Sequence, residues 1–69
     1  MAISYNKLWK ILIDKNMTKT ELRDRVGMSS STLAKLSKNQ EVAMTVLERI
    51  CMELQCDIGD IMEFFPQPE

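Results

Sequence analysis

The sequence predicts an all-α protein, a compact domain of five short helices in which the second and third helices form a helix-turn-helix. Apolar residues recur three and four positions apart through most of the chain, which is the period of an amphipathic helix, and no strand-like alternation is present. Serine, threonine or aspartate, the residues that commonly begin helices, precede several of these patterns. With 69 residues, the chain is expected to form one domain over residues 1–65, followed by a short tail over residues 66–69.

The first helix is expected to run from Tyr5 to about Asn16. Its apolar residues at positions 5, 8, 9, 12 and 13 share one face. Ser4 is the candidate N-cap, because a serine hydroxyl can accept a hydrogen bond from the free backbone N–H groups of a first turn. Trp9 lies on the apolar face, so we expect it to pack in the core, and stacking on a nucleic-acid base is the less favoured alternative.

The second helix is expected over residues 18–26. Thr18 and Glu21 have the spacing of a capping box, in which each side chain bonds the backbone N–H of the other residue. Gly27 follows the last apolar residue of this helix. Because helices often end in a left-handed residue, a conformation that glycine adopts at little cost, Gly27 predicts a tight turn.

The third helix is expected over residues 29–38, directly after that turn. Ser29 is a favourable N-cap, and Leu33 and Leu36 lie on the side that would be buried. Two short helices joined by a glycine turn are typical of a helix-turn-helix. The other helices are expected to hold this pair in place.

Two further helices complete the predicted bundle. The fourth covers residues 43–55, although Thr45 and Glu48 inside that range also have capping-box spacing. A short and very apolar fifth helix is expected to begin after Asp57, where Asp60 completes another capping box. Pro66 ends it, because proline has no N–H to continue the helical ladder.

Charge is divided along the chain, although the formal net charge is only −1. Residues 1–40 carry eight basic and three acidic side chains, a balance of +5, whereas residues 41–69 carry one basic and seven acidic side chains, a balance of −6. A basic surface near the helix-turn-helix is what contact with phosphates requires. The alternative is that these charges only solvate helix faces, and both interpretations remain open at this point.

The two cysteines, Cys51 and Cys56, are expected to be buried or half-buried thiols. The chain has no histidine and no second cysteine pair, and the five-residue spacing is not the C-x-x-C redox motif. We therefore expect no metal site and no cofactor. The longest aliphatic run covers only Ile11 to Ile13, so no membrane span or signal peptide is expected and the chain is predicted to be cytoplasmic.

The central segment, M-T-K-T-E-L-R-D-R-V-G-M-S-S-S-T-L-A-K-L, carries a more specific signal. Its T-x-x-E-L and S-x-x-T-L-x-x-L spacings around a glycine turn resemble the lambda-repressor-like DNA-binding domains, the Cro/Xre group of bacterial and phage regulators. The resemblance extends from about Tyr5 to Met62 and is nearest to small stand-alone regulators of Gram-positive bacteria and their mobile elements. It implies a sequence-specific regulator of transcription, by expectation a repressor, that lays its third helix in the major groove of double-stranded DNA.

The resemblance also implies which residues touch DNA. The family contacts base edges with the first turns of the third helix, which here supply Ser30, Ser31 and Lys35. The positions expected to contact the DNA backbone are Lys19, Arg23, Ser29, Lys38, Asn39 and Gln40. A serine cluster at a helix start could instead serve only as a cap, but in a helix-turn-helix of this spacing we favour contact with DNA.

Two positions depart from the family pattern. Arg23 stands where the family usually has a small residue that lets the two helices approach closely, so its side chain is expected to turn outward, towards DNA. Asn39 stands near the end of the third helix, where the family often has glycine. Because asparagine tolerates positive φ better than most residues, the second change is mild.

A dimer is expected, because one recognition helix would read only about four or five base pairs. The apolar residues available for a dimer interface are Ile58, Ile61, Met62, Phe64 and Phe65. The first three could instead close the core of the monomer, which leaves Phe64 and Phe65 as the better interface candidates.

The alternative function is a protein-interaction module, antitoxin-like or adaptor, that binds a protein partner through its acidic C-terminal part. An enzyme is not expected, because the chain lacks histidine, a nucleophile–base pair and a phosphate-binding glycine loop. Direct sensing of a small molecule is not expected either, because no pocket-forming domain accompanies the helix-turn-helix.

Overall fold

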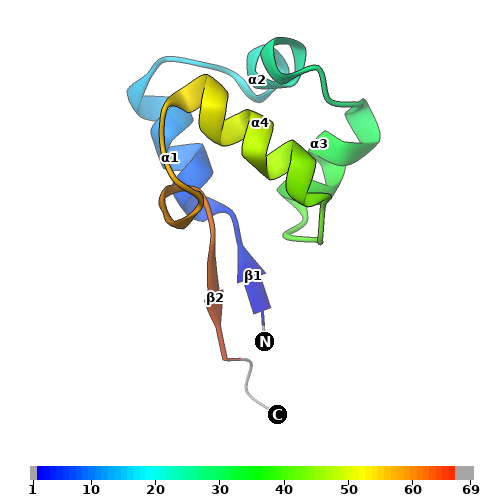
Figure 1. Ribbon diagram of the computed structural model, residues 1–69, viewed down its shortest axis with the longest axis vertical. Helices are drawn as coiled ribbons and strands as arrows, with labels where there is room; N and C mark the ends of the chain where they lie inside the picture. Colours follow the sequence, from blue (N-terminus) through cyan, green and yellow to red (C-terminus); the bar gives the residue numbers. More distant parts are fainter. Residues whose placement is uncertain (1, 67–69) are drawn as a thin grey trace.

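Helix α4 lies across the middle of the molecule, with α1 on one side of it, α3 on the other and α2 above (Figure 1). The computed structural model describes residues 2–66. Over these residues the order of elements is β1 (Ala2–Ser4), α1 (Asn6–Asp14), α2 (Lys19–Val26), α3 (Ser30–Ser37), α4 (Met44–Leu54), the 3₁₀ turn η1 (Ile58–Asp60) and β2 (Glu63–Phe65). Helix α2 packs on both α3 and α4, so the predicted helix pair is held against the central helix.

The prediction of five helices without strands is wrong at both ends of the chain. Residues 58–60 form a single 3₁₀ turn instead of a fifth helix, and β1 pairs antiparallel with β2, with Ile3 opposite Phe64. The capping box between Asp57 and Asp60 does form, but one box does not overcome the cost of nucleating a longer helix. The described residues therefore make a mostly helical fold of four α-helices, one 3₁₀ turn and a two-stranded sheet.

Two helices, α1 and α4, begin without a side-chain cap bond: α1 lacks the cap expected from Ser4, whereas α4 begins where the sequence predicted. Ser4 lies in β1, and Tyr5 is the N-cap of α1 without a side-chain cap bond. The Ser4 hydroxyl still accepts a hydrogen bond from the Asn6 N–H at 3.2 Å, so it supports the first turn from one position further back. Ala43 is the N-cap of α4, again without a side-chain bond, and Thr45 lies inside that helix.

The core contains the residues that the helical periodicity placed on the inner faces. The buried apolar residues are Tyr5, Leu8, Leu12, Leu22, Met28, Leu36, Leu47, Ile50, Leu54 and Ile61. Trp9 packs against this core and is half-buried, which confirms the preferred interpretation of that residue. Ile13 is the exception, since it is 73% exposed at the end of α1. Each fully buried leucine contributes about 1.5–3 kcal/mol of burial free energy, so these few residues account for much of the fold's stability.

Cys51 and Cys56 are free and half-buried thiols, as predicted. Burial is the main reason that the pKa of Cys51 rises to about 11, and burial also raises the pKa of Cys56. Both thiols therefore stay protonated at neutral pH and act as small apolar groups. Among the described residues, no helix combines the length and the apolar character needed to cross a membrane.

Candidate nucleic-acid interface

Helix α2 begins and ends as its sequence predicts. The Thr18 hydroxyl accepts from the Glu21 N–H at 3.1 Å, and the Glu21 carboxylate accepts from the Thr18 N–H at 3.2 Å, which completes the capping box. Gly27 has a φ of +79°, in the left-handed region. The N–H groups of Gly27 and Met28 both donate to the Arg23 carbonyl, at 2.8 and 3.1 Å. These bonds close the tight turn that directs the chain into α3.

The serine cluster builds the first turn of α3. The Ser29 hydroxyl accepts from the Thr32 N–H at 3.1 Å, so Ser29 is the predicted N-cap. The same hydroxyl lies 3.0 Å from the hydroxyls of Ser31 and Thr32. Ser29, Ser30 and Ser31 are all exposed, so capping occupies one hydroxyl of the cluster and leaves an accessible polar surface at the start of the helix.

Arg23 reaches from α2 to the start of α3. Its side chain turns to the surface, as expected, and its Nη1 donates to the Ser30 hydroxyl at 3.1 Å. Its Nε and Nη2 donate to the Asp24 carboxylate at 3.2 and 3.1 Å. The guanidinium therefore lies along the protein surface beside Ser30, which is predicted to contact DNA bases.

Three lysines of the predicted interface keep their charges uncompensated. Among residues 2–66 the ion pairs involve Lys7, Arg23 and Arg25, so Lys19, Lys35 and Lys38 are in none of them. The Lys19 ammonium lies 4.2 Å from the centre of the Trp9 ring and 3.5 Å from the Ser37 hydroxyl. Lys19 thereby links α2 to both α1 and α3, through a cation–π contact worth about 0.5–1 kcal/mol at an exposed site.

The connector after α3 is fixed by Tyr5, a role that the sequence did not reveal. Asn39 has a φ of +57°, and its Oδ1 accepts from the Tyr5 N–H at 3.1 Å. The Tyr5 hydroxyl donates to the Gln40 carbonyl at 2.8 Å. Burial, and then the nearby Glu41 carboxylate, raise the pKa of Tyr5, so this hydroxyl remains a donor. Asn39 and Gln40 are exposed beside their anchor, as a contact with the DNA backbone would require.

The apolar residues proposed for a dimer fall into two groups. Ile61 is fully buried and Met62 half-buried, and both pack in the core of the monomer, which is the alternative considered for them. Phe64 and Phe65 are 61% and 45% exposed, and Ile58 is also exposed. Only this second group presents surface to a partner.

Comparisons with known proteins agree with the helix-turn-helix seen in the structure. A family profile described as the Cro/C1-type HTH DNA-binding domain matches residues 7–67. An uncharacterized HTH-type transcriptional regulator of Bacillus subtilis, YozG, is 38% identical over 66 residues, which cover 93% of this chain and 77% of the relative. The crystal structure of the transcriptional regulator VanUg is similar with a TM-score of 0.92 at 59% identity, covering 96% of this chain and 88% of that one.

Proposed function

The chain belongs to the family of Cro/C1-type helix-turn-helix DNA-binding domains, and we propose that it represses transcription by occupying an operator in double-stranded DNA as a dimer. The two relatives named above are transcriptional regulators, which favours regulation over other uses of DNA binding. The proposed activity is binding without catalysis, and its site of action is the cytoplasm.

The main support for DNA binding is that the first turns of α3 are exposed. Ser30 and Ser31 stand on its first turn, and Lys35 follows one turn later without an ion pair among the described residues. A serine hydroxyl both donates and accepts, whereas a lysine can contact O6 and N7 of guanine in the major groove. We assign base contacts to these three side chains, with Lys35 as the main source of specificity.

Backbone contacts would surround this helix. Lys19 and Lys38 supply charge, Ser29 and the first N–H groups of α3 supply donors, and Asn39 and Gln40 approach phosphates from the connector. Arg23 sits between the two sets, because it can hold Ser30 in place or move to a phosphate.

We place the dimer contact on Phe65. Successive residues of a strand point to opposite faces, and Phe64 faces a cavity of the monomer while Phe65 does not line it. Phe65→Glu should therefore make the chain monomeric in sedimentation, whereas Ile13→Glu, at another exposed apolar position, should not. A wild-type chain that is monomeric at high micromolar concentration would remove the dimer from the proposal.

The test of DNA binding is fluorescence anisotropy with a duplex that carries the region upstream of the gene, beside a scrambled duplex of equal length. We expect tighter binding to this upstream duplex and a linear fall of log affinity with log salt concentration. Equal affinity for both duplexes at every salt concentration would contradict a sequence-specific regulator.

The second candidate is the protein-interaction module. It is favoured by the exposed Phe64 and Phe65 and by the acidic balance of residues 41–69. Retention on heparin at moderate salt separates the two, since a protein of net charge −1 without a basic DNA-binding surface should flow through.

A further inference from the structure

The two thiols of the chain are brought together where α4 ends. Gln55 has a φ of +55°, and the N–H groups of Gln55 and Cys56 both donate to the Cys51 carbonyl, the second at 3.0 Å. At a helix end of this kind, the residue after the left-handed position packs its side chain against one from the last helical turn. Cys56 occupies the first of these positions and Cys51 the second, so the backbone itself places the two side chains in contact.

The side chains of the pair agree with this placement, because each thiol acts on the pKa of the other. After burial, the charge of Cys56 and a hydrogen bond with it raise the pKa of Cys51, whereas the same bond lowers the pKa of Cys56. The Cys51 S–H is therefore the donor and the Cys56 sulfur the acceptor. Both side chains pack against the core but are only half-buried, so a small reagent has access to them.

The number of donors limits what this pair can bind. Among residues 2–66, no group of three or more histidine, cysteine, aspartate or glutamate side chains could hold a metal ion. A structural zinc ion takes four such ligands, so the pair alone does not make a zinc site. A ligand at this position has to be satisfied by two sulfur atoms.

The charges around the pair favour a neutral ligand that reacts with protonated thiols. Metal binding and oxidation both use the thiolate, which burial disfavours at Cys51 and Cys56. The carboxylates of Asp57 and Asp60 disfavour the thiolate further, and only Lys15 opposes them, at Cys56. An uncharged arsenic(III) compound of the form R–As=O avoids this obstacle. Its oxygen takes the two thiol protons and leaves as water while two As–S bonds form, so arsenic stays trivalent and no oxidant is consumed.

We propose that Cys51 and Cys56 form a dithiol site for monosubstituted arsenic(III) compounds, with both sulfurs bonded to one arsenic atom. The helix end already holds the two side chains in contact, so binding requires little further ordering of the chain. This inference does not depend on DNA binding and stands or falls separately from the proposed function.

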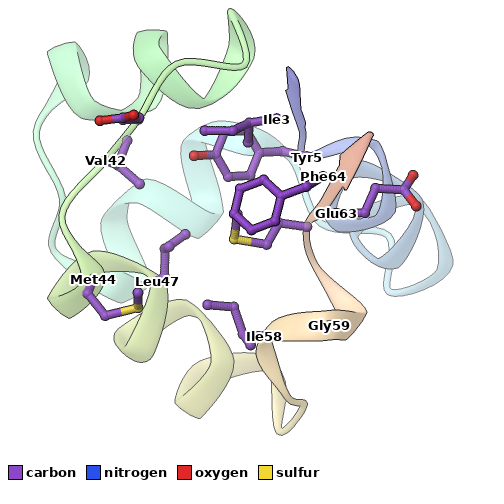
Figure 2. A pocket seen from close by; sticks show the side chains of 11 residues that line it. Ile3, Tyr5, Val42, Met44, Leu47, Ile58, Gly59, Glu63 and Phe64 are labelled. Atoms are coloured by element: carbon purple, nitrogen blue, oxygen red, sulfur yellow. The ribbon is translucent and has the colours of Figure 1, made fainter. Parts of the chain in front are cut away.

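The dithiol site is separate from the apolar cavity of the monomer. That cavity has a volume of about 470 Å³ and opens between the β-ribbon, the α3–α4 connector and η1 (Figure 2). Neither cysteine lines it, so its walls do not enclose the organic group of a bound arsenical. Phenylarsine oxide and methylarsine oxide should therefore bind within about three-fold of each other, once each affinity is divided by that for 2,3-dimercaptopropanol.

Binding is tested by native mass spectrometry of the full, reduced chain with phenylarsine oxide and an excess of glutathione as competing monothiol. We expect one adduct, with the mass of the reagent less one water. Cys51→Ser and Cys56→Ser should each lower the affinity by about 100-fold or more, because the second sulfur then no longer binds at a high effective concentration. Met52→Leu is the matched control, since it removes the exposed thioether beside Cys51 and should leave the affinity unchanged.

Urea denaturation of the adduct tests whether the fold, and not mere closeness in sequence, builds the site. If the folded chain binds the arsenical about ten-fold more tightly than the unfolded chain, the adduct raises the free energy of unfolding by about 1.4 kcal/mol. An unchanged or lowered free energy of unfolding would overturn the proposal, because the folded chain would then hold the thiols no better than the unfolded one. Equal affinities for the wild type and either serine variant would also overturn it, as would a clear preference for the phenyl compound.

Discussion

The Nη1 of Arg23 donates a hydrogen bond to the Ser30 hydroxyl at 3.1 Å, so one side chain bridges the two helices of the helix-turn-helix. A small residue at position 23 could not make this contact. The bridge holds a cation beside a residue predicted to read bases, and it gives the departure from the family pattern a physical role.

Arg23→Gln should lower the slope of log affinity against log salt concentration by about one unit, because one phosphate contact and its counterion release are lost. Anisotropy across a salt series measures the slope. Arg25→Gln is the matched control, since Arg25 lies on the same helix and pairs with Glu53 at 3.6 Å, away from α3. Identical slopes for the two variants would show that Arg23 has only a structural role.

Lys35→Ala should weaken binding to the preferred duplex by about ten-fold or more, because a good contact with a base edge contributes about 1–3 kcal/mol of discrimination. The ratio of affinities for upstream and scrambled duplexes should fall with it. Lys10→Ala, which removes an exposed lysine from α1, should leave that ratio unchanged. A Lys35 variant that weakens both duplexes equally would reassign Lys35 to the DNA backbone.

Gly27→Ala should destabilise the fold by about 1–2 kcal/mol, because a side chain at a φ of +79° strains the backbone although no atom lies within 4 Å of the added Cβ. Urea denaturation measures the change. Gly59→Ala is the control, since that position also has open space but no positive φ, and the loss there should stay below about 0.5 kcal/mol. Equal losses would show that the positive φ of Gly27 does not strain an added side chain.

Asn39→Ala should destabilise by about 1–3 kcal/mol, since it leaves the buried Tyr5 N–H without its acceptor and places alanine at a φ of +57°. Asn39→Gly removes the acceptor but relieves the strain, so it should cost less than alanine. The difference between the two variants in urea denaturation isolates the backbone effect. If Asn39→Gly lowers the free energy of unfolding as much as Asn39→Ala, the lost hydrogen bond alone accounts for the destabilisation.

Iodoacetamide at about pH 8 should alkylate Cys51 of the folded chain at least about ten-fold more slowly than in urea, because thiolate is the reactive form and the folded pKa is about 11. Mass spectrometry of the modified peptide measures the rate. The raised pKa of Cys51 also makes the stability of the fold depend on pH. A thiol whose pKa rises on folding keeps its proton in the folded state, so the free energy of unfolding falls as pH rises from about 9 to about 11. Alkylation at the same rate in both states would contradict the burial of this group.

Local bonds explain why the central part of the fold followed from sequence. The Thr18–Glu21 capping box, the Ser29 cap and the left-handed Gly27 each involve residues within four positions of one another, so their side chains were sufficient to predict them. The core leucines were predictable for the same reason, since helical period alone places them on one face.

Contacts across the chain explain the errors. The pairing of Ile3 with Phe64 joins the two ends of the described chain, and three-residue strands have no readable alternation. The bonds from Tyr5 to Asn39 and Gln40 span 34 and 35 positions. No local sequence pattern marks such partners, so the sequence could predict neither the contact of Tyr5 with the connector nor the position of Phe64 at the cavity.

The sequence by itself determined the helix-turn-helix, its caps and turn, and the residues that present a polar, basic surface on α3, because these depend on interactions inside one or two helical turns. Only the tertiary structure decided that the two ends of the described chain pair as a ribbon, that Tyr5 holds the connector and that a mainly apolar cavity lies beside it. These features form when distant segments pack together, and the loop-closure entropy that opposes such contacts is offset by the burial of the whole core.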